Sequence, residues 1–107
     1  MSADDHFEKV RELVNRLTAQ FLERESNRDA LVSVTHVELS PDTKYATVYI
    51  SVLPESKEHA VLDFAKRLRG DMRNFLKGHM RTRVIPFLEV EIDLGEKNRQ
   101  KIENLLG

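Results

Sequence analysis

Apolar residues recur at steps of three and four positions near the start of the chain. They are Phe7, Val10, Leu13, Val14, Leu17 and Phe21. Successive residues of an α-helix are rotated by about 100°, so this spacing places the six side chains on one face. We predict an amphipathic helix from about Asp5 to Glu25, followed by a polar turn in the segment ESNRDA.

Two segments after this turn alternate apolar and polar residues, which is typical of β-strands with one buried face. The first is LVSVTHVELS, residues 31–40, and the second is YATVYISVL, residues 45–53. The apolar positions of the second segment are Ala46, Val48, Ile50 and Val52. The residues SPDTK between the two segments favour a turn. The pattern therefore predicts an antiparallel hairpin.

A second helical stripe follows the hairpin and contains a glycine. We predict Ser56 as the N-cap of a helix that begins at about Lys57, because a serine side chain accepts hydrogen bonds from the first turn. The apolar stripe of this helix continues to Met80. Gly70 interrupts the stripe at a cost of about 1 kcal/mol relative to alanine in a helix interior, so we expect a bend at this residue.

The last part of the chain returns to a strand pattern and then to a helical one. Beyond Pro86, apolar and acidic residues alternate, which predicts a third strand. Its apolar positions are Leu88, Val90 and Ile92, and its acidic positions are Glu89, Glu91 and Asp93. The segment EKNRQKIENLL then indicates a short C-terminal helix. We expect its apolar residues Ile102, Leu105 and Leu106 to point inward.

These elements predict a single α+β domain over residues 1–107, with residues 96–107 as a short helical tail. A length of 107 residues suits one hydrophobic core, and no linker or internal repeat divides the chain. No apolar run approaches the roughly 18 residues that cross a bilayer, and the acidic start is unlike a signal peptide. The absence of cysteine excludes disulfides and thiolate metal sites. We therefore expect a cytoplasmic protein, and nothing in the sequence requires more than a monomer.

Positive charge is concentrated in residues 66–83. This segment has seven basic residues and one acid, Asp71, and carries +6, whereas the whole chain carries −1 and the remainder therefore −7. On a helix, four of the bases fall within about 80° of each other. They are Lys66, Arg69, Arg73 and Lys77. Rows of this kind bind phosphates, because each base neutralises one phosphate and releases a condensed counterion. The charge distribution favours a nucleic-acid partner over the alternative of a solvated helix face.

Gly70 adds a second feature to this segment. A residue without a side chain lets a sugar-phosphate approach the backbone, and the helix that follows presents free N–H groups. KH domains use a glycine-bearing helix–loop–helix to clamp single-stranded RNA. We therefore predict an RNA-binding surface, with Lys66 at its edge. Its residues are Lys66, Arg67, Arg69, Gly70, Arg73, Lys77, Arg81 and Arg83.

Signals for catalysis are weak. The four histidines show no metal-ligand spacing, and the acids of the third strand have the spacing of an outer strand face rather than of a catalytic pair. Nucleophile-elbow, P-loop and dinucleotide motifs are absent. We predict a protein that is not an enzyme and takes no cofactor, metal or small-molecule substrate. Tyr45 and Tyr49 share a strand face and could stack bases, but cover for the sheet or the first helix is the favoured interpretation.

The segment VTHVELSPDTKYATVYISVL, residues 34–53, resembles the hairpin motif of the ribosome-binding factor A family. That family shows V-T-x-V-x-x-S-x-D followed by A-x-V-Y-[VI]-S. The matching residues are Val34, Thr35, Val37, Ser40, Asp42, Ala46, Val48, Tyr49, Ile50 and Ser51. A second motif, R-x-x-P-x-L-x-[FV]-x-x-D, is matched by Arg83, Pro86, Leu88 and Asp93. The resemblance spans almost the whole chain.

The resemblance implies a type II KH-like fold and a role in ribosome biogenesis. In this family a helix–kink–helix that carries Ala-x-Gly replaces the usual glycine loop, and the corresponding residues here are Leu68, Arg69 and Gly70. The family binds the small (30S) ribosomal subunit and its 16S rRNA during late maturation, aids processing of the rRNA 5′ end, and is associated with cold adaptation. The resemblance implies the same for this chain, and we expect reversal of Arg73 and Lys77 to Glu to abolish subunit binding.

Two other functions stay open. One is a protein-binding adaptor whose hairpin or acidic faces dock a partner while the basic face is incidental, and weak salt dependence of binding would favour it. The other is a small RNA-cleaving enzyme that uses His79 or His36 with Asp93. RNA hydrolysis that is lost on substitution of a histidine would be required to support it.

Overall fold

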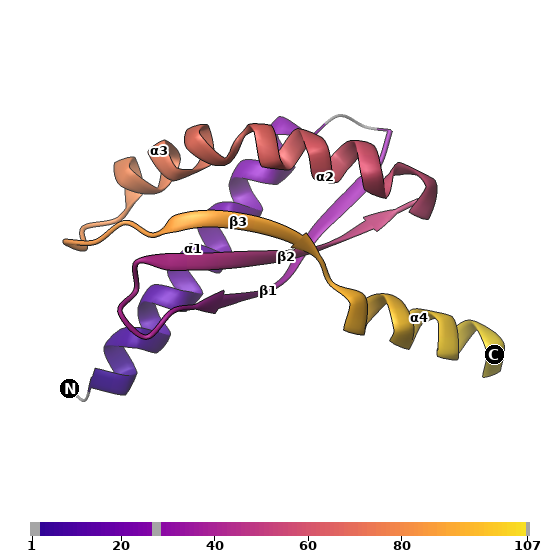
Figure 1. Cartoon of the computed structure of the whole chain (residues 1–107), viewed down its shortest axis with the longest axis horizontal. Helices are drawn as coiled ribbons and strands as arrows, with labels where there is room; N and C mark the ends of the chain where they lie inside the picture. Colours follow the sequence, from indigo (N-terminus) through magenta and orange to yellow (C-terminus); the bar gives the residue numbers. More distant parts are fainter. Residues whose placement is uncertain (1–2, 27–28, 107) are drawn as a thin grey trace.

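Helices cover one face of a three-stranded sheet, and a last helix projects from its end (Figure 1). The computed structural model describes residues 3–26 and 29–106. The elements are α1 (Ala3–Glu25), β1 (Leu31–Leu39), β2 (Tyr45–Leu53), the 3₁₀ turn η1 (Glu55–Lys57), α2 (Glu58–Arg67), α3 (Arg69–His79), β3 (Phe87–Ile92) and α4 (Leu94–Leu106). This order confirms the predicted α+β fold. None of the described helices combines the length and the apolar character needed to cross a membrane.

The sheet has the strand order β1-β2-β3. β1 and β2 are antiparallel, which confirms the hairpin, and β2 and β3 are parallel. The Ser40 hydroxyl closes the hairpin turn by donating to Asp42 Oδ1 at 2.6 Å, and the Ser40 N–H donates to the Tyr45 carbonyl at 2.8 Å. Parallel strands need a long crossover, and here α2 and α3 provide it.

The core lies between the sheet and the helices. The four apolar positions predicted to share one side of the second strand are all buried, with 0–4% of each residue exposed. They face α1 residues such as Val14 and Leu17, and α3 residues such as Met72 and Leu76, which are also buried. Thr18 is the buried polar residue of α1, and its hydroxyl donates to the Val14 carbonyl at 2.7 Å. The apolar periodicity therefore predicted the buried faces correctly.

The bend between the two middle helices lies at Leu68, two residues before the predicted position. Leu68 has φ −93° and ψ 7°, between the end of α2 and the start of α3. Gly70 lies in the first turn of α3 and has no positive φ, and a Cβ there would meet nothing within 4 Å. The prediction that Gly70 forms the bend is therefore wrong. Leu68 packs against the core, which accounts for a large side chain at the bend.

The predicted serine cap of the second helix is also wrong. Ser56 lies inside the 3₁₀ turn η1, and the N-cap of α2 is Lys57, which makes no side-chain capping bond. Within this turn, the Glu58 N–H donates to the Glu55 carbonyl. The 3₁₀ turn thus leads directly into the helix and satisfies backbone groups that a serine cap would otherwise serve.

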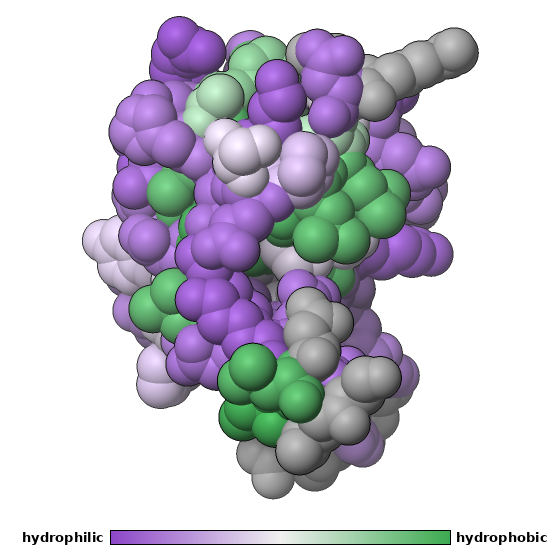
Figure 2. All heavy atoms as spheres, turned by 90° about the vertical axis from the view of Figure 1, so that its right-hand side faces the viewer, coloured by the Kyte–Doolittle hydropathy of each residue, from purple (hydrophilic) through white to green (hydrophobic). Residues whose placement is uncertain are grey.

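The C-terminal helix α4 does not bury its apolar side chains as expected. It begins at Leu94, two residues before the predicted tail, and extends away from the sheet (Figure 1). Ile102 is 56% exposed and Leu105 is 87% exposed, while the Leu106 side chain lies outside the described ones. Figure 2 views the end of the molecule from which α4 projects and shows apolar surface there. The amphipathic pattern was present, but the residues that the structure describes leave Ile102 and Leu105 uncovered.

Candidate nucleic-acid interface

Five of the eight predicted RNA-binding residues line one open hollow. They are Lys66, Arg67, Arg69, Gly70 and Arg73. Asn74, Phe87, Leu88 and Glu89 complete its lining, so the hollow lies between the α2–α3 junction and the start of β3. Figure 1 shows β3 running alongside the two helices. We call the five cations along this side, Lys66, Arg67, Arg69, Arg73 and Lys77, the cationic edge.

The other predicted residues lie outside this hollow. Lys77 is exposed on α3, one helical turn beyond Arg73. Arg81 and Arg83 are exposed in the segment between α3 and β3, where they border a separate hollow together with His6 of α1 and Thr43 of the hairpin turn. The predicted set therefore forms a main site at the helix junction and a second positive area at the far end of α3.

Two cations of the edge already have acidic partners on β3. The Arg69 Nη1 group lies 2.6 Å and 2.7 Å from the two carboxylate oxygens of Glu89. The Lys66 Nζ atom lies 4.0 Å from Glu91 Oε1. These pairs are substantially exposed, and exposed ion pairs contribute about 0–1 kcal/mol. A phosphate can therefore compete with Glu89 and Glu91 for both bases at little cost.

Arg73 is more buried, and makes more contacts within the fold, than is expected of a residue that binds phosphate. It is half-buried, its Nη2 group donates to the Ile85 carbonyl at 3.0 Å, and its guanidinium carbon lies 4.0 Å from the centre of the Phe87 ring. Its Nε atom is buried and has no hydrogen-bond partner among the described residues. Reversal of Arg73 to Glu would therefore disturb the structure as well as the charge.

The remaining cations are exposed and form no ion pair with a described carboxylate. Within the described ranges 3–26 and 29–106, no carboxylate lies in ion-pair distance of the four bases concerned. They are Arg67, Lys77, Arg81 and Arg83. Of these, Arg67 belongs to the main hollow and Lys77 extends it along α3. Arg67 and Lys77 are therefore the cleanest residues for a test of phosphate binding.

A polar cluster at the opposite end of β3 was anticipated only as far as the RNA-cleaving alternative paired His36 with Asp93. The Thr35 hydroxyl donates to Asp93 Oδ2 at 2.5 Å, across 58 residues of sequence. Asp93 Oδ1 accepts a hydrogen bond from the Glu96 N–H at 2.9 Å in the first turn of α4. The Thr35 hydroxyl, followed by the Glu96 N–H, holds the pKa of Asp93 below its ordinary value. The signal was present in the sequence, because Thr35 and Asp93 belong to the two motifs that carry the family resemblance.

Two stacked rings extend this cluster over the open face of the sheet. His36 and Tyr49 have ring centres 4.4 Å apart with an angle of 9° between the planes, and His36 Nδ1 lies 3.2 Å from Asp93 Oδ2. The Tyr49 hydroxyl donates to Glu38 at 3.1 Å. Partial burial, followed by this bond to Glu38, raises the pKa of Tyr49. We call Thr35, His36, Tyr49 and Asp93 the Asp93 corner.

The Asp93 corner has the features of a structural cluster. Both oxygens of Asp93 accept hydrogen bonds from within the fold, one from Thr35 of β1 and one from the first turn of α4, so the carboxylate links these two elements. His79, the other histidine considered for catalysis, lies at the end of α3 with its Nδ1 atom 2.9 Å from the Phe75 carbonyl oxygen. In the part of the chain that the structure describes, no group of three histidines or acids is arranged to hold a metal ion.

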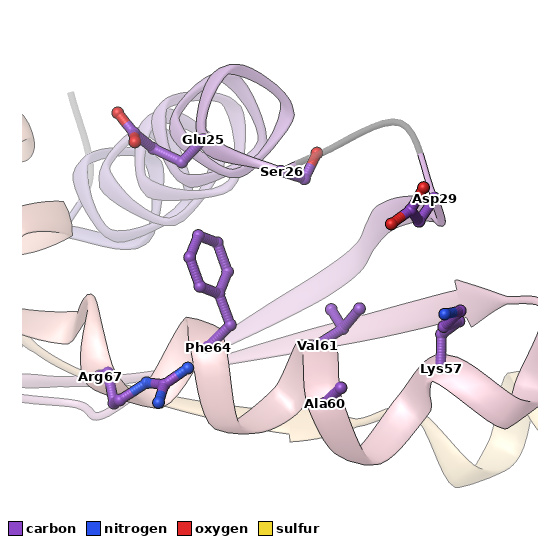
Figure 3. Close-up of a pocket in the computed structure, with 8 residues that line it drawn as sticks. All are labelled: Glu25, Ser26, Asp29, Lys57, Ala60, Val61, Phe64 and Arg67. Atoms are coloured by element: carbon purple, nitrogen blue, oxygen red, sulfur yellow. The ribbon is translucent and has the colours of Figure 1, made fainter.

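A third hollow lies between the end of α1 and α2 (Figure 3). Val61 and Phe64 point from α2 toward the end of α1, and Arg67 stands at one end. The remaining lining includes two acids, Glu25 and Asp29, and a base, Lys57. Because the charges are mixed, this hollow does not favour a phosphate, and the main hollow at the helix junction is the better candidate interface.

Comparison with known proteins identifies the family. The family model described as Ribosome-binding factor A matches residues 6–106. Ribosome-binding factor A of Magnetococcus marinus is 31% identical, over 94% of this chain and 85% of its own length, and that of Thermomicrobium roseum is 31% identical over 92% and 78%.

Solved structures show the same fold. The crystal structure of ribosome-binding factor A from Thermus thermophilus matches with a TM-score of 0.71 and 23% identity, over 79% of this chain and 92% of that one. A homology model of the Thermus factor, fitted into an electron cryo-microscopy map of its complex with the 30S subunit, matches with a TM-score of 0.69 and 24% identity, over 78% and 90%. From the match over residues 6–106 and the relatives at 31% identity, we conclude that the chain belongs to the ribosome-binding factor A family.

Proposed function

We propose that this protein binds the small (30S) ribosomal subunit through its 16S rRNA, with the cationic edge as the contact surface. The observation that carries the proposal is the exposed charge of Arg67 and Lys77, which form no ion pair with a described carboxylate and lie beside an open hollow. Membership of the family supports it, and so does the fitting of a related factor into a map of a 30S complex. The protein acts as a cytoplasmic monomer without catalytic activity of its own, and it assists late maturation and 5′-end processing of the rRNA.

The residues of the interface have different roles in this proposal. Arg67 and Lys77 bind phosphates directly, and Arg81 and Arg83 extend the contact at the far end of α3. Arg69 exchanges its bond to Glu89 for one to a phosphate. Contacts of this kind fix position and orientation but carry little sequence information. Recognition of the subunit therefore depends on the shape of its folded rRNA.

The test is binding to immature small subunits across a salt series, with an Arg67→Glu/Lys77→Glu variant. Each phosphate contact contributes roughly 0.7 to 0.9 to the slope of log affinity against log salt. We expect the variant to bind at least about tenfold more weakly at low salt and to show a slope shallower by about 1.5. Both residues are exposed, so the unfolding midpoint of the variant should match that of the unmodified protein.

An Arg16→Glu/Lys101→Glu variant is the matched control. It makes the same change in net charge at two exposed residues of α1 and α4 that lie away from the cationic edge. It should retain most of the affinity and the full salt slope. Equal losses in both variants would mean that only net charge matters. A shallow slope in every variant would favour a protein partner and would contradict the proposed surface.

The role in processing needs a separate measurement. In cells that depend on this protein, the Arg67→Glu/Lys77→Glu variant should accumulate 16S rRNA with an unprocessed 5′ end, and the control variant should not. Normal processing by a variant that no longer binds subunits would contradict a direct role in maturation.

A further inference from the structure

Two exposed aromatic rings lie beside the cationic edge. Tyr45 and Phe87 are register partners on the parallel strands β2 and β3, and their ring centres are 6.1 Å apart. They are 61% and 57% exposed. Large aromatic side chains normally bury most of their surface, so an exposed pair marks a surface that a partner can cover.

The Phe87 ring is held in place by contact with Arg73. The Arg73 guanidinium lies 4.0 Å from the ring centre, and it is itself held by its bond to the Ile85 carbonyl. Pro86, the residue before Phe87, is fully buried. A ring that is already ordered loses little conformational freedom when a flat ligand binds to it. Arg73 therefore serves as a support for the ring rather than as a free cation.

Besides Arg73, Phe87 lines the same hollow as three further cations of the edge. They are Lys66, Arg67 and Arg69. A flat apolar ring next to basic side chains meets the two requirements of a single-stranded nucleic acid, since its bases stack on aromatic faces while its phosphates need positive charge. Paired bases inside a duplex cannot present their faces in this way. A basic protein segment would be repelled by the cations, so charge favours a polyanion.

We propose that this hollow takes an unpaired nucleotide of single-stranded RNA. The base stacks on the exposed part of the Phe87 ring with Tyr45 beside it, and the neighbouring phosphates bind Arg67 and Arg69. The inference rests on the proposed RNA-binding function and deepens it, because it names the form of RNA that the site prefers. Tyr49, stacked on His36 and bonded to Glu38, takes no part.

The test uses three fluorescent probes: a single-stranded octauridylate, an abasic octamer with the same number of phosphates, and a duplex of two octamers, which has twice that number. The full chain should bind the octauridylate more tightly than either of the others. A Phe87→Leu variant keeps an apolar side chain on the strand and removes the ring. It should bind the octauridylate about tenfold more weakly, with an unchanged salt slope, because stacking on aromatic rings is sensitive to their removal and insensitive to salt. Its affinity for the abasic probe should not change.

Two further variants separate the ring from other effects. Tyr45→Phe retains a ring and should bind as the unmodified protein does. Leu53→Ala removes an exposed apolar side chain at the other end of β2 and should also have no effect. Unfolding midpoints measured on all variants would reveal a folding defect. Equal affinity for the abasic and base-bearing probes would overturn the inference, and so would tighter binding to an acidic peptide than to RNA.

Failure of this inference is distinguishable from failure of the proposed function. If small subunits bind with a steep salt slope but octamers bind without regard to their bases, the stacking site is wrong and the subunit interface stands. If subunit binding is also independent of salt and of Arg67 and Lys77, both are wrong.

Discussion

The charged groups at the end of β3 and those beside the rest of the strand differ in how fully they are paired. After its last residue, the Asp93 corner places the carboxylate among a threonine hydroxyl, a histidine ring and the first turn of α4, and both carboxylate oxygens are bonded. Beside the rest of the strand, the cationic edge has five bases, and Glu89 and Glu91 are their acidic partners. Polar groups whose bonds are satisfied inside the fold stabilise it, and a surplus of one charge remains available to a ligand. One strand thus supports a structural cluster at its end and an interface along the rest of its length.

The largest expected effect that tests this contrast is on stability. An Asp93→Ala substitution removes the acceptor of the Thr35 hydroxyl and the cap of α4. We expect the free energy of unfolding to fall by about 2–3 kcal/mol, because a partly buried charged acceptor and a helix cap are lost together. Urea denaturation measures this value. Binding of the folded variant to small subunits should keep its full salt slope.

Glu103→Ala is the control for this substitution. Glu103 is an exposed acid on α4, and its removal should change the free energy of unfolding by less than about 0.5 kcal/mol. A stable Asp93→Ala variant that no longer binds subunits would contradict the contrast, because it would place the Asp93 corner in the interface.

The same contrast shows what the sequence can and cannot predict. The period-two pattern identified the hairpin and its buried side, because every residue of a strand alternates faces regardless of distant partners. The bond between Thr35 and Asp93 was out of reach of any periodicity, because it depends on how β1 and the end of β3 come together in three dimensions. Both residues were nevertheless marked by the family motifs.

Charge composition predicted which residues form the cationic edge, but it did not predict which of them pair with acids. Charge counting identified the segment that carries +6 and the acids on the outer face of β3. It could not tell that Arg69 bonds to Glu89 while Arg67 forms no ion pair with a described carboxylate, because that depends on how α2 and α3 lie over β3. The glycine signal placed the bend two residues too late, since helix propensity competes with the packing of Leu68 on the core.

A smaller effect is expected at the ion pair between Glu89 and Arg69. A Glu89→Gln substitution keeps the shape of the side chain and removes the acidic partner of Arg69. Since Arg69 no longer has to leave an ion pair, affinity for small subunits should rise by up to about fivefold, which corresponds to the about 1 kcal/mol that an exposed pair contributes at most. The salt slope should steepen by up to about 0.9.

The control for Glu89→Gln is Glu103→Gln, which makes the same change in net charge on α4. It should leave affinity close to that of the unmodified protein. A Glu89→Gln variant that binds more weakly would mean that Glu89 contacts the subunit itself, and the cationic edge would then not be a surface of surplus charge alone.

The smallest expected effect concerns acid. Hydrogen bonds lower the pKa of Asp93 in the folded protein, so its ionised form stabilises the fold above the ordinary aspartate pKa of about 3.9. That stability is lost as the pH falls through the lower folded-state pKa. An Asp93→Asn variant keeps an acceptor but lacks this charge. We expect it to be less stable than the unmodified protein by about 1 kcal/mol at pH 7, and the difference should shrink as the pH falls below the ordinary aspartate pKa and through the lower folded-state pKa. Urea denaturation across this pH range measures the difference. The contributions of the other acids cancel, because both proteins contain them.

Glu89→Gln is the control. Its stability should show no comparable convergence with that of the unmodified protein, because its exposed pair adds little to stability at any pH. A constant gap for Asp93→Asn would mean that the carboxylate charge does not stabilise the corner, and the contrast between the Asp93 corner and the cationic edge would then rest on shape alone.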